Sequence, residues 1–135
     1  MRFPSVQVVR DAAVLTGTYV AGNGPGAEND VDISGANQIV LFLTITMGAL
    51  DSIELRAEVA LASGDRFQEA SAAACKGVAF VRPLEYSIRA VDLTGGTGAL
   101  YLPIPVLGDK VRISAKGTGT TTGSSLTISA ATRDV

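Results

Sequence analysis

The stretch "VRISAKGTGTTTGSSLTISAATR", residues 111–133, gives the clearest information on the fold. Apolar and polar residues alternate on both sides of a Gly/Thr run at 117–123. Alternation with period two is typical of a strand with one buried face, and Gly and Thr suit a connection between strands. We therefore predict a hairpin of two strands here. Its apolar positions are Val111, Ile113, Ala115, Leu126, Ile128 and Ala130.

Other segments predict further strands. Residues 12–20 are rich in β-branched residues, and 52–61, "SIELRAEVAL", alternate cleanly with Ser, Glu and Arg on one face. Residues 38–47, "QIVLFLTITM", are apolar on both faces, which predicts a central strand covered on both sides along its first half. Residues 85–93 and 99–107 are also predicted to form strands.

Within 99–107, "ALYLPIPVL", Pro103 and Pro105 lie two residues apart. Their missing N–H groups fall on the same side of the strand, which predicts an edge strand or a break in it. Short strands are also predicted at 66–69 and 78–81, on either side of an irregular segment. Seven to nine short strands without an ordinary amphipathic helix predict an all-β fold, an antiparallel, jelly-roll-like β-sandwich. We expect one sandwich domain over 11–135, preceded by an extended N-terminal arm over 1–10.

The composition argues against several classes of function. Charged residues make up 18% of the 135 residues and the net charge is -2, so no nucleic-acid partner is predicted. The longest apolar run, 39–43, is far shorter than the roughly 20 residues of a membrane span, and the N-terminus does not resemble a signal peptide. Mean hydropathy is nevertheless high, at +0.32. A chain this apolar is expected to cover surface against other subunits.

No catalytic constellation is visible in the sequence. The chain has no histidine, which removes Ser-His-Asp triads and imidazole ligands, and its lone Cys75 fits a small buried residue better than a nucleophile. Glu54 and Glu58 would lie about 13–14 Å apart on one strand face, too far for a glycosidase pair. We expect no enzyme activity, no cofactor and no metal.

The loop at 22–32 has a composition that could suit a cation. It gathers oxygen ligands that suit Ca²⁺ at Asn23, Glu28, Asn29, Asp30 and Asp32. Their spacing does not match an EF-hand, and turns need the same residue types for backbone reasons, so a solvated loop is the favoured interpretation. Glycine clusters at 22–26, 95–98 and 117–123 are interpreted as turns, since none leads into a helix.

The last third of the chain resembles a known family. The run "LYLPIPVLGDKVRISAKGTGTTTGSSLTISAATR", together with "SIELRAEVALASGDRFQE", resembles small β-sandwich virion structural proteins of tailed bacteriophages. Phe67 stands where those relatives carry a tryptophan, so no contact residue is transferred from them. The residues that carry the resemblance are Pro103, Ile104, Pro105, Val111, Arg112, Ile113, Gly117, Gly119, Gly123, Leu126 and Ile128.

The resemblance implies a non-enzymatic capsid decoration, or cement, protein made in the host cytoplasm and placed on the capsid exterior. Its partners would be the major capsid protein and its own copies, commonly as trimers. Alternatives are a head–tail connector, neck or tail protein and, less favoured, a carbohydrate-binding module. We expect contacts from the arm, the 22–32 loop and the proline edge, through Arg2, Phe3, Pro4, Val6, Asn23, Pro25, Glu28, Tyr101, Pro103 and Pro105.

Overall fold

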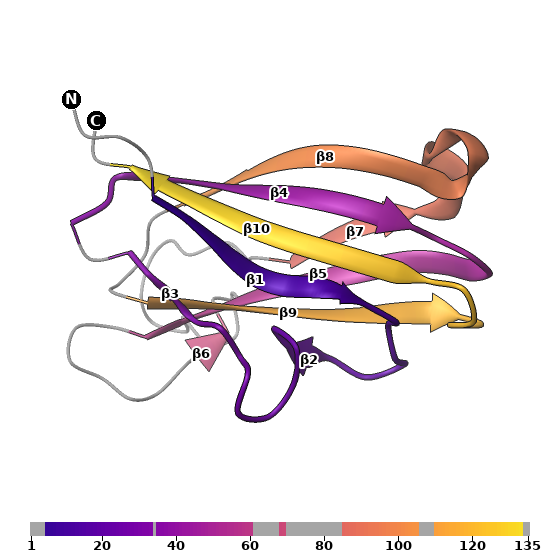
Figure 1. The fold of residues 1–135 in the computed structure, drawn as a ribbon, viewed down its shortest axis with the longest axis horizontal. Coiled ribbons are helices and arrows are strands. Elements are labelled where there is room, and N and C mark those ends of the chain that lie inside the picture. The colour runs from indigo at the N-terminus through magenta and orange to yellow at the C-terminus, as the bar shows by residue number, and fades with distance from the viewer. Residues whose placement is uncertain (1–4, 34, 61–67, 70–84, 106–109, 134–135) are drawn as a thin grey trace, which may run out of the picture.

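The computed structural model describes residues 5–33, 35–60, 68–69, 85–105 and 110–133, and these form a sandwich of two antiparallel sheets (Figure 1). The predicted all-β sandwich is confirmed. The described strands are β1 (Ser5–Ala13), β2 (Val20–Ala21), β3 (Val31–Asp32), β4 (Gln38–Thr46), β5 (Leu50–Ala60), β6 (Gln68–Glu69), β7 (Glu85–Arg89), β8 (Thr97–Ile104), β9 (Lys110–Gly119) and β10 (Ser125–Arg133). Two short 3-10 turns, η1 (Ala90–Asp92) and η2 (Thr94–Gly96), precede β8.

The first sheet, called sheet A, has the strand order β1-β10-β4-β8. The second, called sheet B, is centred on the pair β9 and β5. The short strands β2 and β3 pair with β9, and β6 and β7 pair with β5. In Figure 1 the strands of sheet A run together as one layer, with β9 and β5 in the other. Every pairing among the described strands is antiparallel, and most join strands that are far apart in the sequence.

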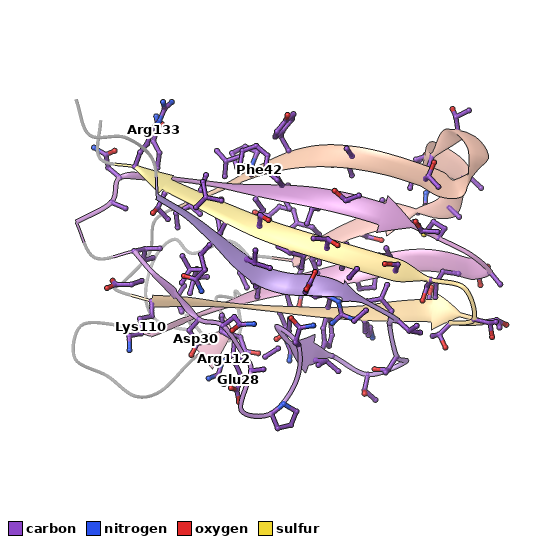
Figure 2. The ribbon with its side chains drawn as sticks, viewed as in Figure 1. Glu28, Asp30, Phe42, Lys110, Arg112 and Arg133 are labelled. Carbon is purple, nitrogen blue, oxygen red and sulfur yellow. The ribbon has the colours of Figure 1, made fainter. Side chains whose placement is uncertain are left out.

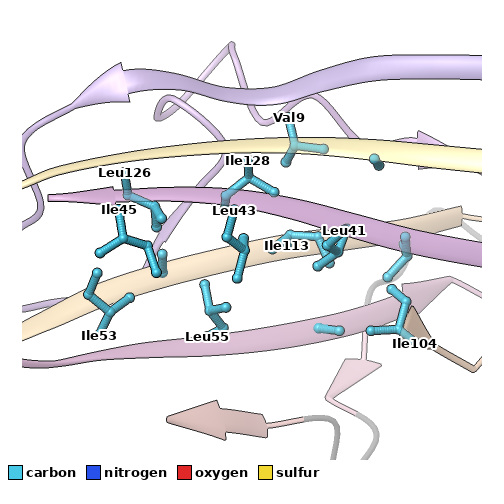
Figure 3. Close-up of a cluster of buried hydrophobic side chains, with 14 of the residues drawn as sticks. Val9, Leu41, Leu43, Ile45, Ile53, Leu55, Ile104, Ile113, Leu126 and Ile128 are labelled. Carbon is cyan, nitrogen blue, oxygen red and sulfur yellow. The ribbon is translucent and has the colours of Figure 1, made fainter. Parts of the chain in front are cut away.

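The core lies between the sheets and is aliphatic, as the composition predicts. One side of β4 contributes Ile39, Leu41, Leu43 and Ile45, each at most 2% exposed (Figure 3). They face side chains of β5 and β9, including Ile53, Leu55 and Ile113 in Figure 3. Burying a side chain of this size stabilises the fold by about 1.5–3 kcal/mol, so these alternating positions specify which face of each strand turns inward.

The predicted hairpin at 111–133 is wrong. Residues 110–119 and 125–133 form strands, β9 and β10, but β9 belongs to sheet B and β10 to sheet A. The Gly/Thr connection crosses from one sheet to the other. Alternation reports which face of a strand is buried, and this is the same whether two strands pair side by side or pack across the core.

The connection from β4 to β5 crosses at the same end of the sandwich. The backbone N–H of Ala49 donates to the carbonyl of Thr122 at 3.3 Å, so the two crossings touch. Gly48 has φ +56°, and a Cβ there would lie 2.6 Å from backbone atoms of Thr122 and Gly123. Only glycine fits this contact between the crossings.

The N-terminal strand also differs from expectation. An arm over 1–10 and a first strand over 12–20 were predicted, but β1 covers Ser5–Ala13 and pairs with β10. Val9 is fully buried in the core. Two register shifts, between Val8 and Arg10 and between Arg10 and Ala13, interrupt the alternation and hide the strand in the sequence. Of the arm, residues 1–4 lie outside the described residues.

Two smaller predictions fall partly outside the described residues. Of the strand expected at 66–69, the structure describes Gln68–Glu69 as β6. The strand expected at 78–81 lies outside the described part of the chain.

The coverage predicted for both faces of 38–47 is wrong, because Phe42 on the outer side of β4 is 36% exposed.

Candidate contact face

The outer face of sheet A presents the apolar side chains that the core does not use. The ladder aligns Val8, Ser129, Phe42 and Tyr101 in one row across all four strands. The next row contains Val6, Ala131, Val40 and Pro103. We call this surface the neutral face; its residues are Val6, Val8, Val40, Phe42, Thr44, Thr46, Thr97, Ala99, Tyr101, Pro103, Ser125, Thr127, Ser129 and Ala131.

Large apolar side chains on this face are unusually exposed. Tyr101 is 73% exposed, Val6 67%, Val8 53% and Phe42 36%. The rings of Phe42 and Tyr101 meet edge to face, with centroids 4.8 Å apart. Apolar side chains that are scattered singly over a surface are normal, but a contiguous patch of them indicates a binding site.

Charge is almost absent from sheet A. Strands β4 and β8 contain no Asp, Glu, Lys or Arg. On the other two strands, Arg10 is buried, Asp11 lies beside the loop at 22–32, and Arg133 ends β10. Arg133 Nε donates to Gln38 Oε1 at 2.8 Å, at one corner of the neutral face. Figure 2 places Phe42 and Arg133 on one side of the molecule and Glu28, Asp30, Lys110 and Arg112 on the opposite side.

A shallow depression of about 240 Å³ opens on the neutral face. It lies between the Phe42 row and the Arg133 corner, and its lining is mainly apolar. The lining residues are Gln38, Val40, Phe42, Ala131 and Arg133. Tyr101 stands next to it, because its ring packs against Phe42. On this face the exposed side chain of Tyr101 therefore stands beside the depression.

The edges of sheet A are less open than its face. Strand β8 keeps its register with β4 from Ile104 to Thr97 without a break, so the missing N–H of Pro103 falls on the outer side of this edge. A strand edge with a lost donor is a poor template for further pairing. The prediction of an edge strand at the prolines is confirmed.

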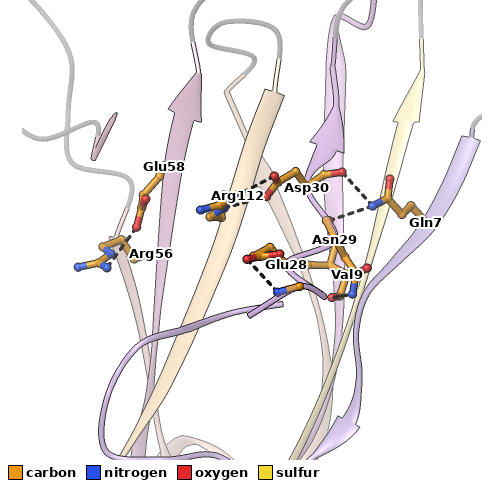
Figure 4. A network of polar contacts seen from close by, with 9 residues as sticks. Gln7, Val9, Glu28, Asn29, Asp30, Arg56, Glu58 and Arg112 are labelled. Atoms are coloured by element: carbon orange, nitrogen blue, oxygen red, sulfur yellow. Dashed lines mark hydrogen bonds and ion pairs between the residues drawn. The ribbon is translucent and has the colours of Figure 1, made fainter. Parts of the chain in front are cut away.

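The opposite edge, β1, is covered by the loop at 22–32. Asn23 Oδ1 accepts from the N–H of Asp11 at 2.9 Å, and its Nδ2 donates to the Asp11 carbonyl at 3.3 Å. Asn29 Nδ2 donates to the carbonyl of Val9 at 2.9 Å (Figure 4). Gln7 Nε2 donates in return to the carbonyls of Asn29 and Asp30. The two asparagine side chains thus take the place of a neighbouring strand.

A buried arginine holds the same loop from inside. Arg10 is 3% exposed and donates to the carbonyls of Gly22, Ala13 and Val14, at 3.0, 3.3 and 2.9 Å. Burial lowers the pKa of Arg10 below its ordinary value. Three carbonyl acceptors compensate for part of the lost hydration, so this cation ties the loop to β1 and is not a surface site.

The acidic groups of the loop are also engaged. The Glu28 carboxylate accepts from the N–H of Gly26 at 3.1 Å, and hydrogen bonds from the backbone N–H groups of Glu28 and Gly26 lower its pKa. Arg112 binds both oxygens of Asp30, at 2.9 and 3.1 Å, and this bond raises the pKa of Arg112 (Figure 4). No group of three or more potential metal ligands is found among the described residues.

The predicted contact residues separate into three groups. Val6, Tyr101 and Pro103 lie on the neutral face, Val6 on one edge strand and the other two on the opposite edge strand, with exposed Pro105 just beyond β8. Pro25 is exposed on the 22–32 loop, whereas Asn23 and Glu28 bind within their own region. Arg2, Phe3 and Pro4 lie outside the described residues. Sequence reasoning missed Ala131, Ser129 and Arg133, although the alternation along 125–133 places them opposite the buried residues.

Comparison with known proteins assigns no family. No protein-family model matches the chain, and no curated protein matches it. The described helical elements are two three-residue turns, and neither is long enough to cross a membrane.

Proposed function

We propose that this protein is a non-enzymatic structural subunit that binds other protein subunits through the neutral face. The exposed apolar rows of that face carry the proposal. Protein interfaces are depleted of charge and enriched in aromatic residues at their centre, with polar groups at the rim. The rows around Phe42 and Tyr101 have this composition, and Arg133 with Gln38 lies at a corner.

We further propose that the particle it joins is a virus capsid. The resemblance of 52–69 and 100–133 to phage virion proteins supports this assignment. In the proposed role the protein is a decoration protein on the capsid exterior, bound to the major capsid protein. Many weak contacts repeated around a symmetric shell would sum to firm attachment and stabilise it without any chemical step.

Reconstitution tests the proposal. Purified protein is mixed with undecorated shells of the virus that encodes it, and the mixture is sedimented and then heated. We expect the protein to sediment with shells at a saturating copy number and to raise the temperature at which they break. A protein that neither sediments with shells nor raises that temperature would exclude the decoration role.

Copy number separates the proposal from its alternative, a neck or tail protein. A shell component is expected in hundreds of copies per particle, and a connector or tail component in about a dozen or fewer, as the cyclic symmetry of such rings requires. Quantitative mass spectrometry of intact particles would count them. A count near twelve would reject the shell position while leaving the structural role in place.

A further inference from the structure

The neutral face fits a second copy of this chain. We propose that two copies pack face to face through it and are related by a two-fold axis. The inference rests on the proposed contact role of this face and names its occupant in the free protein. Three observations support it: the absence of charge, the matched projection and hollow, and the closed strand edges.

The first observation is electrostatic. In a two-fold contact the same patch meets itself, so any net charge near its centre faces a like charge. The rows of Phe42 and Val40 contain no charged residue on any of the four strands. Two copies of a neutral surface therefore face each other without charge repulsion. The same surface offers no electrostatic attraction to a strongly charged partner.

The second observation is shape. In a two-fold dimer each contact occurs twice. If a projection of the first copy enters a hollow of the second, the same projection of the second copy enters the hollow of the first. The 73% exposed ring of Tyr101 is the projection, and the 240 Å³ depression that includes Val40 and Ala131 is the hollow. The remaining rows bear Thr, Ser and Ala, whose short side chains allow two sheets to approach closely.

The third observation concerns the edges of sheet A. The described edge at β8 lacks a donor at Pro103, and the edge at β1 is covered by Asn23 and Asn29. Both features oppose the addition of a strand from another chain. The face remains as the surface of sheet A through which copies can associate.

The size of the face sets the expected strength. Four strands of about eight residues cover about 19 Å by 26 Å, or roughly 500 Å² per copy. A standard stable interface buries about 800 Å² per partner, so this contact belongs to the small, reversible class. We expect a dimer with a dissociation constant of the order of micromolar.

Sedimentation velocity across a concentration series tests the inference. The wild-type protein should move from monomer towards twice the 13.8 kDa chain mass as concentration rises. Tyr101→Arg and Ala131→Arg each bring two like charges into the contact, and both should remain monomeric at concentrations where the wild type dimerises. Val91→Arg is the matched control, because Val91 is 80% exposed on η1, outside the neutral face.

The outcomes are decisive in either direction. Wild-type protein that stays monomeric, forms a trimer, or loses association equally in Val91→Arg would overturn the two-fold packing. A melting curve for each variant verifies folding, and Ala131→Arg keeps the test valid if Tyr101→Arg is destabilised. If the protein is monomeric in solution but sediments with shells only when Tyr101 is intact, the neutral face binds the shell protein and not a second copy; this would reject the dimer and keep the proposed function. If the protein dimerises through this face but does not bind shells, the dimer would stand and the proposed function would be rejected.

Discussion

The outer face of sheet B carries charged side chains along β5, β7 and β9, whereas the neutral face of sheet A carries none in its central rows. On sheet B the charges are engaged locally. Glu54 accepts from Ser52 and Ser87, Arg56 pairs with Glu58 at 3.1 Å, and the Arg56 and Lys116 cations lie 4.1 and 4.8 Å from the Tyr19 ring centroid.

One pleated fold thus carries two outer faces of different chemical character. Charged side chains that pair with their neighbours keep a sheet face hydrated and unreactive toward other proteins. Valine, phenylalanine and tyrosine side chains gain free energy when another surface removes them from water, at roughly 25 cal/mol per Å² of apolar area. The neutral face is therefore the surface on which binding is expected.

The largest loss of stability is expected from a substitution at the contact between the two connections that cross from one sheet to the other. Gly48→Ala places a Cβ 2.6 Å from the backbone of the other crossing, at φ +56°. We expect a loss of about 3 kcal/mol or more in the free energy of unfolding. Urea denaturation measures it. Gly17→Ala is the control, since nothing lies within 4 Å of its added Cβ, and an equal loss there would contradict the explanation.

The next effect separates the two faces directly. Thr44→Arg adds a positive charge to the neutral face, and Ser87→Arg adds the same charge to the outer face of sheet B, beside Glu54. Shell binding should weaken about 10- to 100-fold for Thr44→Arg, or about 1.4–2.7 kcal/mol, because the charge would be buried unpaired. Ser87→Arg should bind within about twofold of wild type, since a charge outside the contact has no such cost.

Co-sedimentation titrations give both affinities. Equal weakening by the two substitutions would show that general surface charge, and not one face, governs binding. Weakening by Ser87→Arg alone would place the contact on sheet B.

A smaller effect is expected from the charges of sheet B. Arg112→Met removes the bidentate pair with Asp30, whose side chain is 26% exposed, and should lower the free energy of unfolding by about 1 kcal/mol. Arg89→Met removes the pair with Asp92, which is 58% exposed, and should cost close to nothing. Thermal melts at low and high salt would compare them. Shell binding by both variants should equal that of the wild type.

The smallest effect concerns pH. The pKa of Glu28 is lowered in the folded protein by backbone hydrogen bonds, so ionised Glu28 stabilises the fold above its unfolded pKa of about 4.3. That contribution is lost as pH falls through the still lower folded pKa. Glu28→Gln should be less stable than wild type at pH 7, and the difference should vanish in strong acid. Urea midpoints at both pH values measure this, and a difference that persists in acid would argue against the hydrogen-bond explanation.

The sequence predicted the strands of the sandwich better than their partners. The alternation at 53–58 correctly separates core side chains from outer ones, because burial acts on each strand separately, whereas the apolar run at 38–47 wrongly predicts coverage on both faces. The same alternation cannot distinguish a hairpin from a crossing between sheets, and β9 and β10 were therefore placed wrongly. The bulges in β1 hid that strand, since an inserted residue shifts the pattern by one position.

The candidate site was predicted only in part. Pro103 identified the edge, and Tyr101 and Val6 were selected as contacts, but no local pattern reveals that these residues form adjacent rows with Ala131. That proximity arises from the strand order β1-β10-β4-β8, which joins the two ends of the chain to its middle. The role of Asn23 was missed for the same reason, because its partner Asp11 belongs to the strand hidden by the bulges.

Side-chain footprinting with hydroxyl radicals tests the central claim most directly. The oxidation rates of Tyr101 and Phe42 are compared with those of Tyr86 and Val91, in free protein at low concentration and on shells. If the neutral face binds the shell, the oxidation rates of Tyr101 and Phe42 should fall several-fold on binding, while those of Tyr86 and Val91 should be unchanged. Unchanged oxidation of Tyr101 on fully decorated shells would contradict the account.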